Sequence, residues 1–278
     1  MAEKYLRPAF FIIGERKCGT SSFYRYLLDH PRVLPCKIKE PQFFSRSLPY
    51  RLLCYARYRA LFPKAADTSP ARLEWLTWSP SGKLVREELT FPRTAEDPMT
   101  GEASANTFAQ VPPRRLKRAF PEARLFLLLR NPVDRAWSHY RMFQRFADAG
   151  RRMPVDLHNF STDLRREIAA TNQGGRSYFI APGLYERKLP AWLEVFGDAL
   201  KVVRSEDLAD PSRACEVMLD ACRFLNLAPH AFEQVVAARH NTTPASEMSH
   251  SDRSLLRSFY TPSVRQVEHI LGRQMHWT

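Results

Sequence analysis

The chain has 278 residues, of which 44% are hydrophobic, and its formal net charge is +13 at pH 7. This length and apolar content suffice for one large core, so we expect a single domain over residues 1–278. The positive charge favours anionic ligands, but the arginines are scattered along the chain, which argues against a nucleic-acid-binding protein. The five cysteines are odd in number and form no C-x-x-C pair, which argues against a disulfide framework and a zinc site.

The first predicted element is an apolar strand over Phe10–Ile13, which runs into a loop that contains Gly14 and Gly19. A helix is predicted over Thr20–Asp29. Glycines let backbone N–H groups turn toward an anion, and a helix N-terminus adds its own donors, so the pattern is typical of a phosphate-binding loop. The nucleoside-triphosphatase pattern G-x-x-x-x-G-K-[ST] is broken, because a threonine stands at the lysine position and Lys17 lies inside the loop. The candidate phosphate-binding residues are Arg16, Lys17, Cys18, Gly19, Thr20, Ser21 and Ser22.

A carboxylate among cations comes next, in the segment Lys39-Glu40-Pro41-Gln42-Phe43-Phe44. From the residues alone, Glu40 can be a loop carboxylate that pairs with Lys39 or Lys37. Residues 45–100 are rich in proline, and we predict a less regular insertion that faces an acceptor molecule. Within it, Arg51–Arg59 has tyrosines among basic residues and could face a membrane or a polyanion, but we expect an ordinary amphipathic helix under the cleft.

A second buried strand is predicted over Arg124–Leu129, whose continuous apolar run is typical of a parallel sheet covered on both faces. It ends at Arg130, and Pro132 then opens a predicted helix that reaches Phe146. An arginine at a strand end suits an anion, because it presents a rigid fork of donors to phosphate oxygens. The alternative for Arg130 is a surface ion pair with Asp134.

The remaining chain alternates helices and one more strand. We predict a strand over Leu200–Arg204 and helices over Arg114–Ala119, Gly183–Phe196, Ser212–Phe224 and Pro262–Leu271, the last with Thr261 as N-cap and Gly272 past its end. Strands that alternate with helices indicate an α/β fold, here a P-loop-like three-layer sandwich with a central parallel sheet.

The segments around Lys17, Glu40 and Arg130 together resemble the sulfotransferases that use 3′-phosphoadenosine 5′-phosphosulfate (PAPS), in particular the carbohydrate and heparan-type enzymes and their bacterial relatives. The resemblance implies that the loop around Lys17 binds the 5′-phosphosulfate and that Arg130 and Ser138 bind the 3′-phosphate. It also implies that Glu40 is the general base and that Lys17 stabilises the bridging oxygen as adenosine 3′,5′-bisphosphate leaves. No metal is expected.

The resemblance extends more weakly to other segments. Tyr178 lies in a segment similar to the family's Gly-x-Tyr motif and is a candidate nucleotide contact. Glu102 and Ser104 resemble acceptor-side residues, although a polar strand edge is an equal alternative for them. The chain departs from the family where Gln42 and Ala103 replace a histidine and a lysine. It also lacks the late lysine- or arginine-glycine dipeptide in residues 239–253, where the candidates for a nucleotide lid are Arg239, Asn241 and Thr242.

Two other functions stay open at this point. A P-loop kinase would need a lysine at the helix start, and a polyanion-binding module would leave Glu40 without a role. The acceptor is expected to be a saccharide or a small metabolite, with a peptide also open, and either a hydroxyl or an amine can be sulfated. Residues 1–8 contain no apolar signal region and no run of eighteen apolar residues occurs, so we expect no transmembrane segment and a cytoplasmic location.

Overall fold

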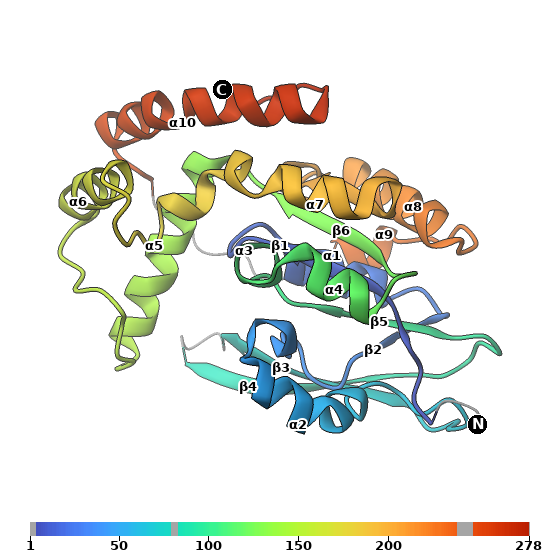
Figure 1. The fold of residues 1–278 in the computed structure, drawn as a ribbon. Coiled ribbons are helices and arrows are strands. Elements are labelled where there is room, and N and C mark those ends of the chain that lie inside the picture. The colour runs from blue at the N-terminus through green and yellow to red at the C-terminus, as the bar shows by residue number, and fades with distance from the viewer. Residues whose placement is uncertain (1–3, 79–82, 238–246, 278) are drawn as a thin grey trace.

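A five-stranded parallel sheet forms the centre of the protein (Figure 1), and its strand order is β2-β5-β1-β6-β7. The computed structural model describes residues 4–78, 83–237 and 247–277. The strands of this sheet are β1 (Pro8–Gly14), β2 (Val33–Pro35), β5 (Met99–Ala103), β6 (Arg124–Leu129) and β7 (Leu200–Arg204). The predicted α/β fold is confirmed, and the strands predicted over residues 10–13, 124–129 and 200–204 are present.

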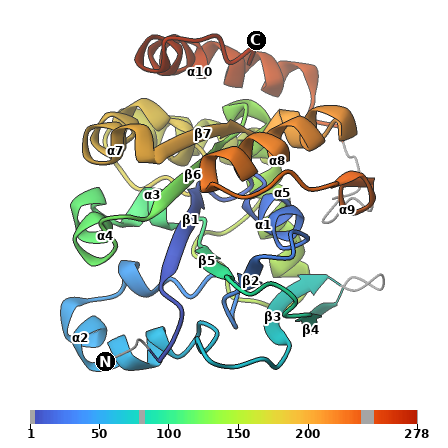
Figure 2. The ribbon, with the colours of Figure 1, turned by 90° about the vertical axis from the view of Figure 1, so that its right-hand side faces the viewer.

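Helices cover both faces of this sheet (Figure 2), which explains why its two central strands, β1 and β6, are almost entirely apolar. Leu125, Phe126, Leu127 and Leu128 of β6 are fully buried. One face carries α1 (Thr20–Leu27), α8 (Pro211–Leu225) and α9 (Glu233–Ala237), and the other carries α3 (Thr107–Gln110), α4 (Pro113–Ala119) and α7 (Leu189–Phe196). Because the strands are parallel, the loops that follow β1, β5 and β6 meet at one edge, where ligands of such sheets usually bind.

A second apolar cluster joins α5 (Pro132–Asp148), α6 (Phe160–Asn172) and the long helix α10 (His250–Leu271). The prediction that the last helix starts at Pro262 is wrong, because Pro262 lies inside α10 and Ser249 caps the helix by accepting the Asp252 N–H. A buried stripe of Leu256, Tyr260 and Val267 continues across the proline. Burial of this stripe therefore outweighs the cost of about 3 kcal/mol that an internal proline carries.

The proline-rich segment is more regular than the sequence predicts. It contains α2 (Leu48–Arg59), which confirms the helix favoured over residues 51–59, and an antiparallel hairpin of β3 (Ala71–Trp78) and β4 (Leu84–Phe91). These elements lie at the end of the molecule opposite to α10 (Figure 1). The hairpin was missed because the prolines of the segment indicate irregular structure, although buried Leu73 and Trp75 alternate with charged residues as they do in a half-buried strand.

Two further differences concern the C-terminal half. The helix predicted from Gly183 is interrupted, since short 3-10 turns at Ala181–Gly183 and Tyr185–Arg187 precede α7, which begins at Leu189. Helix α6 was not predicted. Within the described ranges, no helix is both long and apolar enough to cross a membrane.

Candidate active site

The loop between β1 and α1 has the backbone geometry that the sequence predicts for anion binding. A Cβ on Gly14 would lie 2.6 Å from the Leu128 carbonyl oxygen, so no side chain fits there. Gly19 has a φ of 85° and Lys17 a φ of 74°, both in the left-handed region. Lysine rarely adopts that conformation, and such strain is common where a side chain is held for function. The left-handed backbone conformation at Lys17 thus sets the direction in which its side chain leaves the loop.

Cations from separate elements act on the Lys17 ammonium group. Burial, together with the positive charges of Arg130, Arg145 and Lys39, lowers the pKa of Lys17 to about 8. Arg130 also donates from Nη1 to the Lys17 carbonyl oxygen at 3.2 Å, and Tyr185 donates to the Arg130 carbonyl oxygen at 2.8 Å. The arrangement is electrostatically unfavourable without an anion, so these residues form a cationic site that an anion would stabilise.

The pairing of β1 with β6 explains why Lys17 and Arg130 meet. Gly14 lies opposite Leu128 in the parallel register, so the loops after both strands start at the same edge of the sheet. The alternative ion pair between Arg130 and Asp134 does not form, because Asp134 pairs with Arg253 at 2.9 Å. The Arg130 guanidinium therefore bonds to the loop and not to Asp134.

Helix α5 carries Ser138 and Arg145 away from the end of β6. Asn131 caps this helix by accepting the Val133 N–H at 3.0 Å, and Ser138 is half-buried two turns into it. Arg145 was missed by the sequence analysis, although its spacing offers a signal: it lies two helical turns beyond Ser138 and therefore on the same side of α5. The role of Ser138 stays a prediction.

The other residues of the loop fill or anchor it. Arg16 donates from Nε to the Asn106 side chain at 3.0 Å, while Thr20 is buried at the start of α1 and Ser21 and Ser22 are half-buried beside it. Cys18 is fully buried and its thiol lies 3.6 Å from the Tyr185 hydroxyl. Burial raises the pKa of Cys18 to about 11, so the thiol is neutral and adds no negative charge to the loop.

The candidate base Glu40 lies in a tight turn that follows β2. Its φ is 60° and that of Gln42 is 49°. Lys39 Nζ contacts Glu40 Oε1 at 2.9 Å and Gln42 Nε2 donates to Oε2 at 3.3 Å, so the expected alternative pairing with Lys39 does occur. Burial alone would raise the pKa of Glu40, but the Lys39 charge and the Gln42 hydrogen bond outweigh it and lower that pKa below its ordinary value. Glu40 is therefore an ionised carboxylate, ready to accept a proton.

Glu102 lies on β5, an inner strand between β2 and β1, and the buried Ser104 directly follows that strand. Glu102 is 1% exposed, and the Tyr58 hydroxyl donates to its Oε2 at 2.7 Å. Burial raises the pKa of Glu102 to about 7, against the hydrogen bonds from Tyr58 and Ser104. Glu102 thus connects β5 with α2 beneath the turn that carries Glu40.

The sequence analysis did not predict the contact between two buried residues of α5, Arg135 and His139. Arg135 is fully buried on α5 and lies 3.3 Å from His139 Nδ1, and it also donates to the Phe179 carbonyl oxygen. Burial, with the charge of Arg135, lowers the pKa of His139 well below its ordinary value. His139 is therefore a neutral imidazole near physiological pH.

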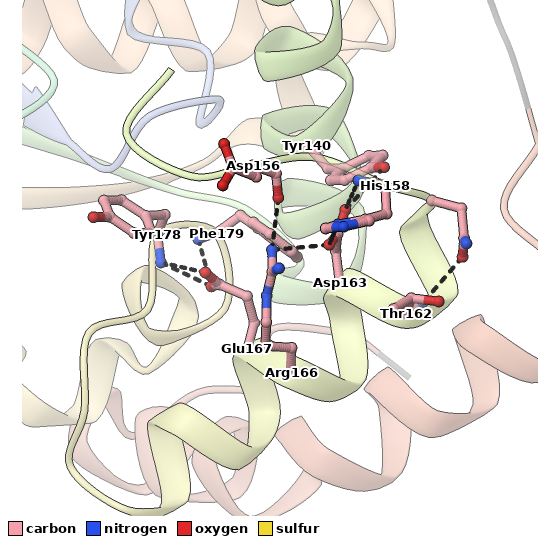
Figure 3. A network of polar contacts seen from close by, with 10 residues as sticks. Tyr140, Asp156, His158, Thr162, Asp163, Arg166, Glu167, Tyr178 and Phe179 are labelled. Carbon is pink, nitrogen blue, oxygen red and sulfur yellow. Dashed lines mark hydrogen bonds and ion pairs between the residues drawn. The ribbon is translucent and has the colours of Figure 1, made fainter. Parts of the chain in front are cut away.

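Tyr178 belongs to a different network, drawn in Figure 3. Its backbone N–H donates to Glu167, whose buried carboxylate also accepts the Phe179 and Ile180 N–H groups. The Tyr178 ring points away from that carboxylate (Figure 3), and the Arg176 guanidinium lies 5.6 Å from the ring centroid. A nucleotide contact of Tyr178 stays a prediction. The lid candidates Arg239, Asn241 and Thr242 lie outside the described residues.

Comparisons with known proteins address the same arrangement. The model of the sulfotransferase family matches residues 8–222, which include every segment that forms the cationic site. The chain belongs to the sulfotransferase family. The enzyme class predicted from the sequence is thereby confirmed, and the kinase alternative is set aside.

Individual relatives support this membership. The chain is 29% identical to rat (Rattus norvegicus) carbohydrate sulfotransferase 15, over 95% of its own length and 53% of the relative's. It is 26% identical to human bifunctional heparan sulfate N-deacetylase/N-sulfotransferase 3, over 80% of its own length and 23% of the relative's. The chain therefore spans about half or less of these two relatives.

Solved structures agree with the fold. A sulfotransferase from Alicyclobacillus acidocaldarius superposes with a TM-score of 0.67 at 27% identity, and the match covers 98% of both chains. Mouse sulfotransferase SULT7A1, solved as a complex with PAP, gives a TM-score of 0.56 at 10% identity and covers 95% of this chain and 87% of its own. The second similarity concerns the fold alone.

Proposed function

We propose that this protein transfers a sulfuryl group from PAPS to a hydroxyl or amine of a carbohydrate or small metabolite, with Glu40 as the general base. One observation carries the proposal: Lys17, in a left-handed loop conformation, is held by Arg130 at the edge of the sheet, and the charges of Arg130, Arg145 and Lys39 all act on its ammonium group. Such a concentration of positive charge suits a donor that carries a phosphosulfate and a second phosphate.

On the donor side, the loop would hold the 5′-phosphosulfate and Arg130 with Ser138 the 3′-phosphate. PAPS supplies the sulfuryl group and leaves as adenosine 3′,5′-bisphosphate, which needs no proton. Lys17 then has an electrostatic task, because its ammonium group stabilises the negative charge that develops on the departing bridging oxygen. The PAP complex of the mouse structure supports a bisphosphate nucleotide at a fold of this kind.

On the acceptor side, Glu40 takes the proton of the attacking hydroxyl or amine. Its carboxylate is ionised, and its side chain keeps 32% of its surface exposed, so an acceptor can reach it. The lowered pKa makes it a weak base in the resting protein. An acceptor that separated Lys39 from Glu40 would remove the main cause of that lowering and strengthen the base as it binds.

The names of the relatives favour a carbohydrate as the acceptor, since they include a carbohydrate sulfotransferase and a heparan sulfate N-sulfotransferase. Two side chains of this protein depart from the family pattern at the same place, Gln42 and Ala103. Gln42 here donates to the base itself, which gives it a role in positioning Glu40. We therefore keep both saccharides and small metabolites as acceptor classes.

Incubation with PAPS and a panel of sugars and small metabolites tests the proposal, with mass spectrometry to detect the gain of one sulfuryl group. Calorimetry provides a second test that needs no acceptor. We expect adenosine 3′,5′-bisphosphate to bind more tightly than ATP, with no dependence on Mg²⁺. Tighter binding of ATP in the presence of Mg²⁺ would contradict the proposal.

A further inference from the structure

The orientation of α2 is fixed by one buried tyrosine. Tyr58 is 2% exposed, its hydroxyl donates to Glu102, and its ring stacks on Phe43 with the centroids 4.3 Å apart. The side of α2 opposite Tyr58 must therefore face outward. Figures 1 and 2 both place the helix on the outside of the molecule, at the end away from α10.

That outward side is apolar. Leu52 is 73% exposed and Leu53 83%, which makes them the two most exposed large hydrophobic side chains of the described residues, and Leu48 is 57% exposed. At 100° per residue, Pro49 and Ala56 fall on the same side as Leu52 and Leu53. A surface helix ordinarily turns its leucines toward the core, so this helix has the opposite arrangement.

Positive charge surrounds this apolar surface. No aspartate or glutamate occurs between Glu40 and Asp67, and the cations of the interval are Arg46, Arg51, Arg57, Arg59 and Lys64. Arg46 and Arg57 are exposed at either end of the helix. Tyr50 and Tyr55 lie at the margins of the leucines with their rings about half exposed, and the Arg46 guanidinium lies 5.8 Å from the Tyr50 centroid.

We propose that α2 is an interfacial helix that docks the protein on a bilayer containing anionic phospholipid. Exposed leucines, flanking tyrosines and surrounding arginines are the composition of helices that lie in the membrane interface, where apolar side chains enter the acyl boundary and cations meet lipid phosphates. The docking surface consists of Leu48, Tyr50, Leu52, Leu53, Tyr55 and Arg57.

Charge and apolar surface together favour an anionic bilayer over two other partners, a second copy of the chain and a dissolved polyanion. A second copy of the chain would bring two α2 segments face to face, and since residues 41–66 carry five cations and no carboxylate, like charges would oppose that contact. A water-dissolved polyanion would engage the arginines and leave Leu52 and Leu53 in water. An anionic bilayer satisfies both the charge and the apolar surface.

Cosedimentation of the full chain with vesicles tests the proposal, without PAPS or acceptor, so that its outcome is independent of the transfer reaction. We expect binding to mixed phosphatidylcholine and phosphatidylglycerol vesicles and little binding to pure phosphatidylcholine. The double variant Leu52→Glu/Leu53→Glu should lower partitioning on the order of a hundredfold, because two buried leucines are lost. Arg57→Glu should lower it by about tenfold.

A matched control is Leu76→Glu, since Leu76 is an exposed leucine on the charged face of the β3–β4 hairpin, and it should bind as the unchanged protein does. Circular dichroism checks that each variant is folded. Three results would overturn the proposal: no binding to the anionic vesicles, equal binding by the double leucine variant, or heparin binding as tight as vesicle binding and insensitive to the leucine changes. A dimer in light scattering that the double variant abolishes would assign the surface to a second copy and would also overturn it.

Discussion

The two sides of the candidate site are built differently. On the donor side, Lys17 and Arg130 follow neighbouring inner strands of the main sheet, and the hydrogen bond of Arg130 goes to the backbone of the loop. On the acceptor side, Glu40 lies in a turn between the main sheet and the hairpin, and its partners are the side chains of Lys39 and Gln42. The donor side is thus organised by the fold, and the acceptor side by side-chain contacts that a substrate can rearrange.

This difference predicts that donor binding and proton transfer can be separated by mutation. Changes on the donor side should alter nucleotide affinity, whereas changes at Glu40 should alter the rate alone. The following experiments test that separation, from the largest expected effect to the smallest.

Glu40→Gln should lower turnover by about 10²- to 10⁴-fold while the affinity for adenosine 3′,5′-bisphosphate stays nearly unchanged. The amide keeps the size of the side chain but cannot accept the acceptor's proton. Turnover is measured at saturating PAPS, and calorimetry gives the affinity. Glu88→Gln is a suitable control, because Glu88 is an exposed carboxylate that pairs with Arg72 on the hairpin. Near-normal turnover of Glu40→Gln would place the base elsewhere, with Glu102 and His139 the next residues to test.

Arg130→Ala should weaken binding of adenosine 3′,5′-bisphosphate by about ten- to a hundredfold, as expected for the loss of a charged hydrogen-bonding partner. Turnover at saturating PAPS should fall much less. Arg130→Lys keeps the charge but loses the two-pronged donor geometry, so its affinity for adenosine 3′,5′-bisphosphate should lie between that of the unchanged protein and that of Arg130→Ala. An unchanged dissociation constant for Arg130→Ala would show that Arg130 only supports the loop.

Nucleotide affinity should depend on pH through Lys17. Its pKa is lowered to about 8, and a bound anion favours the protonated ammonium group, so affinity is highest below this pH and falls as pH rises through it. We expect a loss of up to about tenfold over the next pH unit, measured by calorimetry. Lys17→Gly is the matched variant, because glycine accepts the φ of 74° and removes the charge. If that variant kept the same pH dependence, another group would be responsible.

Tyr58→Phe should lower the free energy of unfolding by about 1–2 kcal/mol, because it leaves a buried carboxyl oxygen of Glu102 without its donor. Denaturant unfolding at neutral pH measures the change. Tyr55→Phe serves as the control, since its ring is about half exposed, and should have almost no effect. Equal stability of the two variants would mean that the Tyr58 hydroxyl does not stabilise the contact between α2 and β5.

The contrast between the donor side and the acceptor side also explains which parts of the structure the sequence could predict. The strand over residues 124–129 and the loop around Lys17 were predicted correctly, because a continuous apolar run and correctly spaced glycines admit few other structures. The hairpin was not predicted, since the prolines around it outweighed the short alternation of buried Leu73 and Trp75 with charged neighbours. Arg145 lies on the same side of α5 as Ser138, two helical turns further along. A motif at the end of a strand does not extend that far, so Arg145 was not predicted.

The start of α10 was missed for a related reason. Pro262 is a strong local signal for a helix start, but Leu256 and Tyr260 before it pack in the same buried stripe as Val267 after it. Tertiary burial therefore decides the helix length, and local residue preference does not.

The segment that carries Glu40 is bonded to two bodies at once. The Glu40 backbone N–H donates to the Ala103 carbonyl oxygen at 3.1 Å. The Lys39 N–H donates to the Glu74 carbonyl oxygen at 3.0 Å, and the Glu74 N–H donates to the Lys37 carbonyl oxygen at 2.6 Å. The turn is therefore a mechanical bridge between the main sheet and the β3–β4 hairpin. Because Glu40 is bonded to the main sheet and Lys39 to the hairpin, a displacement of the hairpin relative to the sheet would act first on the ion pair between Lys39 and Glu40.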